Sequence, residues 1–375
     1  MSELSYMDKL LDGVEVEWID VKDLCGVITT GKLNANAMED NGVYPFFTCN
    51  QHPYKINSYA FDMEAILISG NGSQVGHLNY YNGKFNAYQR TYVVGGFKDN
   101  VKVMYFFYYL NHTLKNYIIK NSRKGSVPYI TMPMLENFKI PIPPLNVQAE
   151  IVRILDTFTE LTAELTAELT ARQQQYAYYR EQLLTSFNDD ETEIKTLKDI
   201  FIMKAGQHIS ASKISANKST SHIYPCFGGN GIRGFVDEKS HDGSYLLIGR
   251  QGALCGNVHR MSGEFYATEH AVVVTAKDGI NIDWAFHKLT LMNLNQYASK
   301  SAQPGLAVGK LAGLKVSVPS LDEQERIAAI LDKFEAITAS LTEGLPREIE
   351  LRQQQYEYYR DLLLSFPKPE VVAHD

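Results

Sequence analysis

Residues 172–187 read RQQQYAYYREQLLTSF, and nearly the same letters return as RQQQYEYYRDLLLSF at residues 352–366, an offset of 180 positions. A second pair lies upstream, because residues 145–165 match residues 321–341 at an offset of 176. Repetition on this scale indicates that one structural unit occurs twice in a chain. The 375 residues therefore divide into two equivalent halves, each a variable block followed by a shared block.

The variable blocks also match each other, more weakly. ILISGNGSQVG at residues 66–76 answers LLIGRQGALCG at residues 246–256. Short runs rich in Val, Ile, Tyr and Phe are broken by Asn-Gly, Gly-Asn and Pro, which is typical of β-strands joined by tight turns. Each block also contains one amphipathic helical stretch, roughly residues 105–117 and 284–297. We expect each variable block to form a compact α/β domain.

The shared blocks carry the pattern of long helices. Apolar residues recur in steps of 3, 4, 3 and 4, which keeps one apolar stripe on one face and predicts packing against a partner helix. The stripe consists of Ile151, Ile154, Phe158, Leu161 and Leu165 in the first copy and of Ile327, Ile330, Phe334, Ile337 and Leu341 in the second. Gly344 and Pro346 predict a break or kink in the second copy.

A third partial copy stands near the N-terminus, where YMDKLL at residues 6–11 resembles residues 179–184 and 359–364. A chain whose start resembles its own middle and end suggests a circular arrangement. The expected fold is α+β, with two α/β domains carrying twisted β-sheets, separated by two long antiparallel coiled-coil helices in a pseudo-twofold circular arrangement. The expected segments are a first domain at 1–144, a central helix at 145–187, a second domain at 188–320, a C-terminal helix at 321–367 and a tail at 368–375.

The composition excludes several classes of protein. A net charge of −7 with 45% hydrophobic residues fits packed cores rather than a disordered tail protein. No stretch approaches the ~18 continuous apolar residues of a membrane span, so we expect no membrane role and a cytoplasmic location. The four cysteines are widely spaced without a CxxC, which predicts neither a disulfide framework nor a metal site.

The distribution of charge points to the variable blocks as a binding surface. Residues 100–135 contain Lys120, Arg123 and Lys124 among five basic residues and no acid, and residues 284–320 contain Lys300 among four basic residues and no acid. Nearby amides such as Gln303 could contact base edges while the cations contact phosphates. One such segment would be explained by a solvated face, but its recurrence in both halves favours DNA binding.

Glycine-rich turns follow an apolar strand in both halves. The first contains Asn71, Ser73 and Gln74, and the second contains Arg250 and Gln251. These turns could bring side chains to a DNA groove, where Arg250 could make a bidentate contact to guanine. The structural alternative is a hairpin turn that requires positive φ. The equivalent turns differ in chemistry, with Asn71 in the first set against Arg250 in the second. Such a difference is expected of two domains that read different DNA sequences.

Motifs of catalysis are not found. The letters GNGIRG at residues 229–234 match GxGxxG, but the following FVDEKSHDGS does not predict a helix, so the phosphate-binding geometry is missing. The pair Pro143-Pro144 lacks the preceding Asn or Asp and the following aromatic residue of an amino-methyltransferase signature. P-loop, HExxH and GxSxG motifs are missing too. The sequence predicts a chain without catalytic or metal-ligating residues.

The whole pattern resembles the specificity subunit of type I restriction-modification systems. The resemblance rests on LDEQERI at residues 321–327, the tandem TAEL at residues 162–169 and the two RQQQY copies. It implies that each variable block is a target recognition domain that reads one half of a split double-stranded DNA sequence. It also implies that the helices set the spacer and dock two methyltransferase (modification) subunits, which are joined by restriction/translocase subunits. S-adenosylmethionine, ATP and Mg would belong to those partners, with no cofactor in this chain.

Two other classes remain open from the residues. A coiled-coil scaffold with two ligand-binding β-rich heads and no DNA role would explain the helices but not the paired basic segments. A self-sufficient DNA methyltransferase would explain DNA binding, but it should show its cofactor loop and an aromatic-flanked Pro-Pro.

Overall fold

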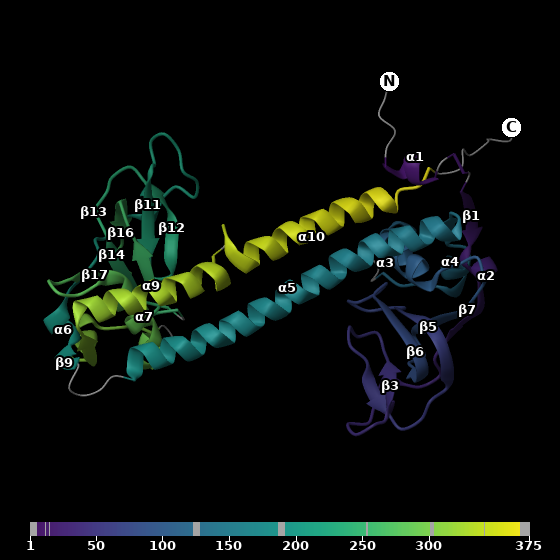
Figure 1. Cartoon of the computed structure of the whole chain (residues 1–375), viewed down its shortest axis with the longest axis horizontal. Coiled ribbons are helices and arrows are strands. Elements are labelled where there is room, and N and C mark those ends of the chain that lie inside the picture. Colours follow the sequence, from purple (N-terminus) through teal and green to yellow (C-terminus); the bar gives the residue numbers. More distant parts are fainter. Residues whose placement is uncertain are drawn as a thin grey trace. The chain divides into compact units, whose positions relative to one another are not determined.

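The computed structural model describes residues 6–11, 13–14, 16–122, 128–186, 192–252, 254–300, 304–340 and 342–367. The chain forms two compact units that do not follow the order of the sequence. Unit 1 comprises Met1–Glu164 together with Glu350–Asp375, and unit 2 comprises Leu165–Ile349. Each unit therefore combines one variable block with helical segments from both shared blocks, as a circular arrangement requires (Figure 1).

The variable part of unit 1 is built on a mixed six-stranded sheet in the order β2-β7-β5-β6-β3-β4, with a separate pair β1-β8. Most neighbouring strands are antiparallel, and β3 and β6 are parallel. The elements are α1 (Tyr6–Leu11), β1 (Glu17–Asp20), α2 (Val21–Leu24), β2 (Cys25–Thr30), η1 (Ala35–Ala37), β3 (Tyr44–Phe47), β4 (Tyr54–Ile56), β5 (Phe61–Ser69), β6 (Leu78–Ala87), β7 (Thr91–Phe97), α3 (Val103–Asn121), α4 (Met132–Glu136) and β8 (Lys139–Ile142).

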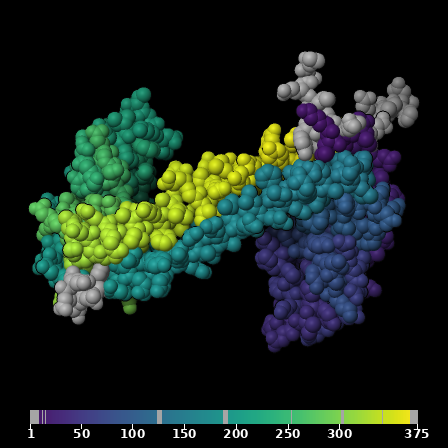
Figure 2. All heavy atoms as spheres, viewed as in Figure 1, coloured from purple at the N-terminus to yellow at the C-terminus, as the bar shows by residue number. Residues whose placement is uncertain are grey.

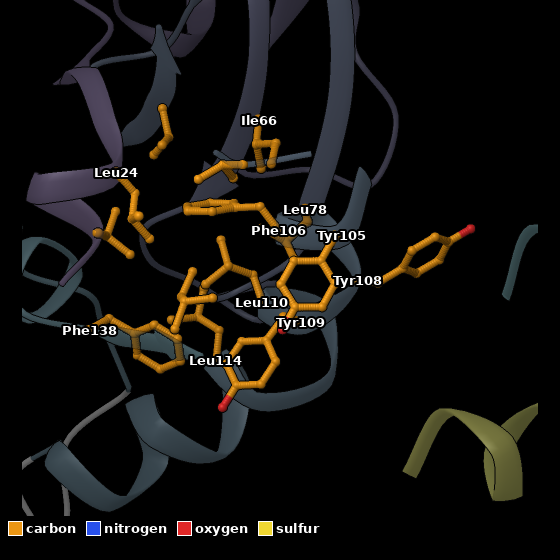
Figure 3. Close-up of a cluster of buried hydrophobic side chains, with 14 of the residues drawn as sticks. Leu24, Ile66, Leu78, Tyr105, Phe106, Tyr108, Tyr109, Leu110, Leu114 and Phe138 are labelled. Atoms are coloured by element: carbon orange, nitrogen blue, oxygen red, sulfur yellow. The ribbon is translucent and has the colours of Figure 1, made fainter. Parts of the chain in front are cut away.

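Both faces of the central strand β5 are buried, which explains its continuous apolar run. Successive side chains of a strand point to opposite faces. Ile66 and Ile68 therefore pack with α3, where Phe106 and Leu110 are fully buried (Figure 3). Leu67 packs on the opposite face in a smaller, aromatic-rich cluster. The helix α3 is thus fixed to the sheet along most of its length.

Unit 2 repeats this plan with its strands divided between two four-stranded sheets, β10-β17-β14-β15 and β12-β11-β16-β13, and a pair β18-β9. The elements are β9 (Thr192–Thr196), α6 (Leu197–Ile200), β10 (Phe201–Ala205), η3 (Ala211–Lys213), β11 (Tyr224–Gly228), β12 (Gly231–Val236), β13 (His241–Asp242), β14 (Tyr245–Gly249), β15 (Val258–Met261), β16 (Glu264–Ala267), β17 (Ala271–Ala276), α7 (Ile282–Leu291), η4 (Leu294–Tyr297), α8 (Val308–Ala312) and β18 (Lys315–Pro319).

The two units match at the level of individual strand pairs. In unit 1 the parallel pair β3·β6 aligns Phe46 with Asn86, and in unit 2 the parallel pair β11·β16 aligns Cys226 with Tyr266. Both residues of the second pair stand 180 positions after their counterparts in the first pair, and this is the offset seen in the sequence. The second amphipathic stretch differs from the first, because α7 ends at Leu291 and a left-handed residue, Asn293, separates it from η4.

Long helices link the variable parts of the chain. The first shared block forms one helix of 41 residues, α5 (Leu145–Thr185). The second shared block forms α9 (Leu321–Thr338) and α10 (Gly344–Leu363), with a break where Gly344 adopts a positive φ. A Cβ atom on Gly344 would lie 2.3 Å from the carbonyl oxygen of Ala336, so this turn requires glycine. The predicted break is therefore present.

The end of the sequence completes the core of unit 1. Leu363, Leu364 and Phe366 are buried in the same cluster as α3 and the start of α5. Within this unit the last part of α10 runs opposite to the first part of α5, and their atoms adjoin (Figures 1 and 2). In unit 2 the same role falls to Leu184, the counterpart of Leu364 at an offset of 180, which is fully buried with α7 and α9.

Two further expectations from the sequence concern the cysteines and the possibility of a membrane-spanning helix. All four cysteines are free thiols in the structure, three of them buried. Across the described part of the chain, no helix combines the length and the apolar character that crossing a membrane demands.

Candidate nucleic-acid interface

In unit 1 several turns and a chain segment converge at one end of the sheet. The turn after β5 is closed by hydrogen bonds from the Gly76 amide to the Ser69 carbonyl, at 2.8 Å, and from the Gly70 amide to the Arg90 carbonyl, at 2.9 Å. The Ile130 amide donates to the Gly70 carbonyl, also at 2.9 Å. Residues 60 positions apart are thereby held side by side.

These segments line a pocket of about 510 Å³, which we call the turn pocket. Its lining residues include the polar Asn71, Gln89 and Arg90, and Tyr129 is an aromatic residue of its wall with 41% of its surface exposed. The Cys49 thiol donates to the Asn71 side-chain oxygen at 3.2 Å and orients that amide. The turn pocket therefore presents a guanidinium and two amides, which are the groups that recognise base edges.

Unit 2 builds the same framework from equivalent residues. The Gly256 amide donates to the Gly249 carbonyl at 2.7 Å, and the Arg250 amide donates to the His270 carbonyl at 2.8 Å. The Leu306 amide donates to the Arg250 carbonyl at 2.9 Å, as Ile130 does to Gly70. The Arg250 side chain is half-buried, and its guanidinium reaches the Glu269 carbonyl at 3.4 Å.

This framework corrects the pairing of the two turns. The sequence comparison set Asn71 against Arg250, but the backbone hydrogen bonds make Gly70 the counterpart of Arg250 and Asn71 the counterpart of Gln251. The side chains of Ser73, Gln74 and Gln251 are exposed at the tips of the turns. Their proximity to DNA stays a prediction.

Of the remaining predicted DNA contacts, Lys120 and Lys300 are among the residues that the structure describes. Lys120 is exposed in the last turn of α3, and Lys300 is exposed just after η4. Arg123, Lys124 and Gln303 lie outside the described residues.

Sequence reasoning missed Gln89 and Arg90 in unit 1 and His270 in unit 2. The signal was available for two of them, because Arg90 and His270 stand between strand segments that match at an offset of 180. They were overlooked because they are isolated in the sequence and join the glycine-rich turns only through hydrogen bonds across the sheet.

A buried glutamine anchors each variable block to its long helix. Gln148 has no exposed surface, and its side-chain amide donates to the carbonyls of Asn100 and Pro143 and accepts from the Lys102 amide, at 2.8–2.9 Å. Gln324 makes the same three kinds of bond, to the carbonyls of Gly279 and Pro319 and from the Asn281 amide. The two residues are equivalent at an offset of 176.

A second anchor joins α3 to α5 and α7 to α9. The Tyr108 hydroxyl donates to the Asp156 carboxylate at 2.5 Å. In unit 2 the imidazole of His287, fully buried, lies 2.8 Å from the Asp332 carboxylate. Burial lowers the pKa of His287, so its neutral form is favoured in the folded protein.

His287, Asp332 and Glu335 lie close enough to hold a metal ion. However, the Arg260 guanidinium contacts the carboxylates of Asp283, Asp332 and Glu335, with a distance of 2.7 Å to Asp332. These acids are therefore already compensated by a cation, and the cluster is explained as an ion-pair network. The basic residue Lys288 is also structural, because its ammonium donates to the carbonyl of Leu184 at 2.6 Å.

The predicted apolar stripe is divided between two environments. Ile151 and Ile327 are fully buried in the domain cores, together with Leu155 and Leu331 beside the stripe. Phe158 stacks on Tyr359 at a centroid distance of 5.3 Å.

Phe334 stacks equivalently on Tyr179 at 5.7 Å. The stripe residues Ile154, Leu161, Leu165 and Ile330 are half-buried. Ile337 is 41% exposed at the end of α9, and Leu341 lies outside the described residues.

The repeated RQQQY segments leave equivalent aromatic side chains in solvent. Tyr178 is 60% exposed and Tyr358 is 65% exposed, although the neighbouring Tyr179 and Tyr359 pack on phenylalanine. The glutamines at 173, 174, 353 and 354 are exposed as well. The chain thus displays nearly the same surface twice.

Comparison with known proteins gives a consistent result. The family model described as the type I restriction modification DNA specificity domain matches twice, at residues 13–172 and 189–351. The EcoprrI type I restriction enzyme specificity subunit of Escherichia coli is 50% identical, over 92% of this chain and 93% of that protein. The EcoR124I/EcoR124II specificity subunit of Escherichia coli is 33% identical over the full length of both chains.

Among solved structures, the S subunit of a type I restriction-modification system from M. genitalium superposes with a TM-score of 0.62. It is 15% identical and covers 96% of this chain and 98% of that one. At this identity the match supports the fold alone.

Proposed function

We propose, from the premise that this chain belongs to the family of type I restriction-modification specificity subunits, that each of its two units reads one half of a bipartite double-stranded DNA target. The chain is a non-catalytic subunit of that family, and its task is DNA sequence recognition. The base-reading surface we assign is the turn pocket of unit 1 and the equivalent turns of unit 2.

One observation carries this assignment. The two units share a backbone framework down to individual hydrogen bonds, yet the side chains on that framework differ. A backbone hydrogen bond joins Gly70 to Arg90 in unit 1, and the equivalent bond joins Arg250 to His270 in unit 2. A common scaffold with different polar side chains is what two readers of different half-sites require, since base contacts specify the sequence.

The helices supply the second part of the proposal. The exposed Tyr178 and Tyr358, each flanked by exposed glutamines, present nearly the same surface in two places. Large exposed aromatic groups mark interfaces, and a repeated surface fits two copies of one partner. We assign these surfaces to two methyltransferase subunits and the helix length to the spacing between the half-sites.

The remaining partners follow from the family. Restriction/translocase subunits would join outside the methyltransferase subunits, and S-adenosylmethionine, ATP and Mg would bind to those partners. Because all of these act on cellular or incoming DNA, we place the complex in the cytoplasm.

Methylome sequencing tests the proposal. The full-length chain would be expressed with the methyltransferase subunit of the same system in a host without either gene. We expect methylation at a bipartite motif that disappears when only this chain is removed. A control strain would carry a hybrid in which residues 188–320 come from the EcoR124I/EcoR124II relative, and one half-site alone should change.

Unchanged methylation without this chain would refute the proposal. It would favour the scaffold class, in which the β-rich parts bind other ligands. A hybrid that alters both half-sites would show that the units do not read DNA separately.

A further inference from the structure

The two units place arginine on opposite sides of one equivalent hydrogen bond. In unit 1 the bond joins the Gly70 amide to the Arg90 carbonyl, and in unit 2 it joins the Arg250 amide to the His270 carbonyl. Each pair therefore contains one guanidinium, contributed by the turn after β6 in unit 1 and by the turn after β14 in unit 2.

Packing in unit 1 disfavours a side chain at position 70. A Cβ atom on Gly70 would lie 2.5 Å from the Arg90 carbonyl oxygen and 2.9 Å from the Tyr92 ring. No side chain fits there without movement of the backbone. At the place of Tyr92, unit 2 has the smaller Val272, which pairs with Ile248 as Tyr92 pairs with Ile68. Unit 2 therefore lacks the aromatic ring that a side chain at this position would meet in unit 1.

Arg90 is free to bind a ligand. Its side chain is exposed and takes part in no hydrogen bond or ion pair with the described residues, whereas Arg250 is half-buried against the Glu269 carbonyl. Asn71 and Gln89 line the same pocket beside it. A guanidinium among amides, next to the exposed ring of Tyr129, has the donors that base edges accept.

We propose that Arg90 is a specificity-determining residue of unit 1 and that it recognises a guanine through a bidentate contact to O6 and N7. This inference rests on the proposed function and assigns the reader of its first half-site. Arg250 provides the same guanidinium chemistry to the second half-site from the opposite turn. Arginine is suited to this contact because its planar fork matches the two guanine acceptors.

The experiment uses the full-length chain in complex with the methyltransferase subunit, and methylome sequencing reads the motif. Arg90→Ala should make one guanine position of one half-site degenerate, with discrimination reduced about 10- to 100-fold, and leave the other half-site unchanged. Arg90→Lys should also lose discrimination, because lysine keeps the charge but not the fork. Lys55→Ala removes one positive charge from unit 1 outside the turn pocket and should leave the motif intact.

Each other outcome has a defined meaning. A uniform loss of methylation at all sites in Arg90→Ala, restored by Arg90→Lys, would identify a phosphate contact and overturn the inference. An unchanged motif in Arg90→Ala would overturn it as well, while the wild-type bipartite motif would still support the proposed function. If the wild-type complex produced no bipartite motif, the proposed function itself would fail.

Discussion

Replacing Gln148 by methionine should lower the free energy of unfolding of unit 1 by about 2–6 kcal/mol. Methionine has a similar length but forms none of the three hydrogen bonds that the buried amide makes. The Pro143 carbonyl stays buried and unsatisfied, which costs ~1–3 kcal/mol, and each of the other two bonds contributes ~0.5–1.5 kcal/mol. Gln324→Met is the matched change in unit 2, since it removes the equivalent three bonds.

The two tryptophans allow each unit to be observed separately. Trp18 belongs to unit 1, and Trp284 is fully buried in unit 2. Each glutamine variant would be made in two backgrounds, Trp284→Phe and Trp18→Phe, and urea unfolding would be followed by fluorescence. With a slope of ~2 kcal/mol per M, in the middle of the usual range, we expect the urea midpoint to fall by about 1–3 M for the unit that carries the substitution.

The comparison within each background is the control for the tryptophan replacement. A change below ~0.5 kcal/mol in both units would refute the reasoning that these amides satisfy buried backbone groups. Equal shifts of both fluorescence signals by one substitution would show that the units unfold together rather than independently.

Three further predictions concern the helices and their anchors. Phe158→Asp should destabilise unit 1 by about 2 kcal/mol in thermal melts, since it loses the stacking on Tyr359 and places a charge at a half-buried apolar position, whereas Thr157→Asp on the exposed face should not. Inserting one more TAEL after Leu169 adds ~6 Å of rise and ~40° of rotation, so the spacer in the methylome should lengthen by about one to two base pairs, with unchanged half-sites. Burial lowers the pKa of the His287 imidazole below its ordinary value of about 6.5, so the unfolded chain binds the proton more readily than the folded one. The stability of unit 2 should therefore fall as pH drops through that value, and His287→Tyr, the residue type of Tyr108 in unit 1, should flatten this slope.

The repeated sequence allowed much of the fold to be predicted. Residues 6–11, 179–184 and 359–364 share a sequence pattern and fall at α1, at the end of α5 and at the end of α10, and this pattern predicted the circular arrangement. Ile337 marks the limit of that reasoning. Its spacing fits the stripe, but α9 ends one residue later because the turn at Gly344 follows.

The interface was harder to predict than the helices. Gly70, Arg90 and Ile130 are neighbours only because hydrogen bonds cross between strands and an extended segment, and no short motif records that meeting. The segments 66–76 and 246–256 match at an offset of 180, which pairs Asn71 with Gln251, so the comparison of Asn71 with Arg250 was displaced by one residue.

The burial of Leu363, Leu364 and Phe366 in the core of unit 1 has a consequence for synthesis on the ribosome. The strands of this unit are translated first, but roughly 220 residues separate the end of β8 from Phe366, which at ~5–20 residues per second is a delay of some tens of seconds. The buried core residues of unit 2 lie between Leu184 and Leu331, so unit 2 can complete its folding before the last core residues of unit 1 have been synthesised. Folding order should therefore be the reverse of translation order, and a nascent chain released before residue 363 would expose the apolar surface of Tyr105 and Ile151 to solvent.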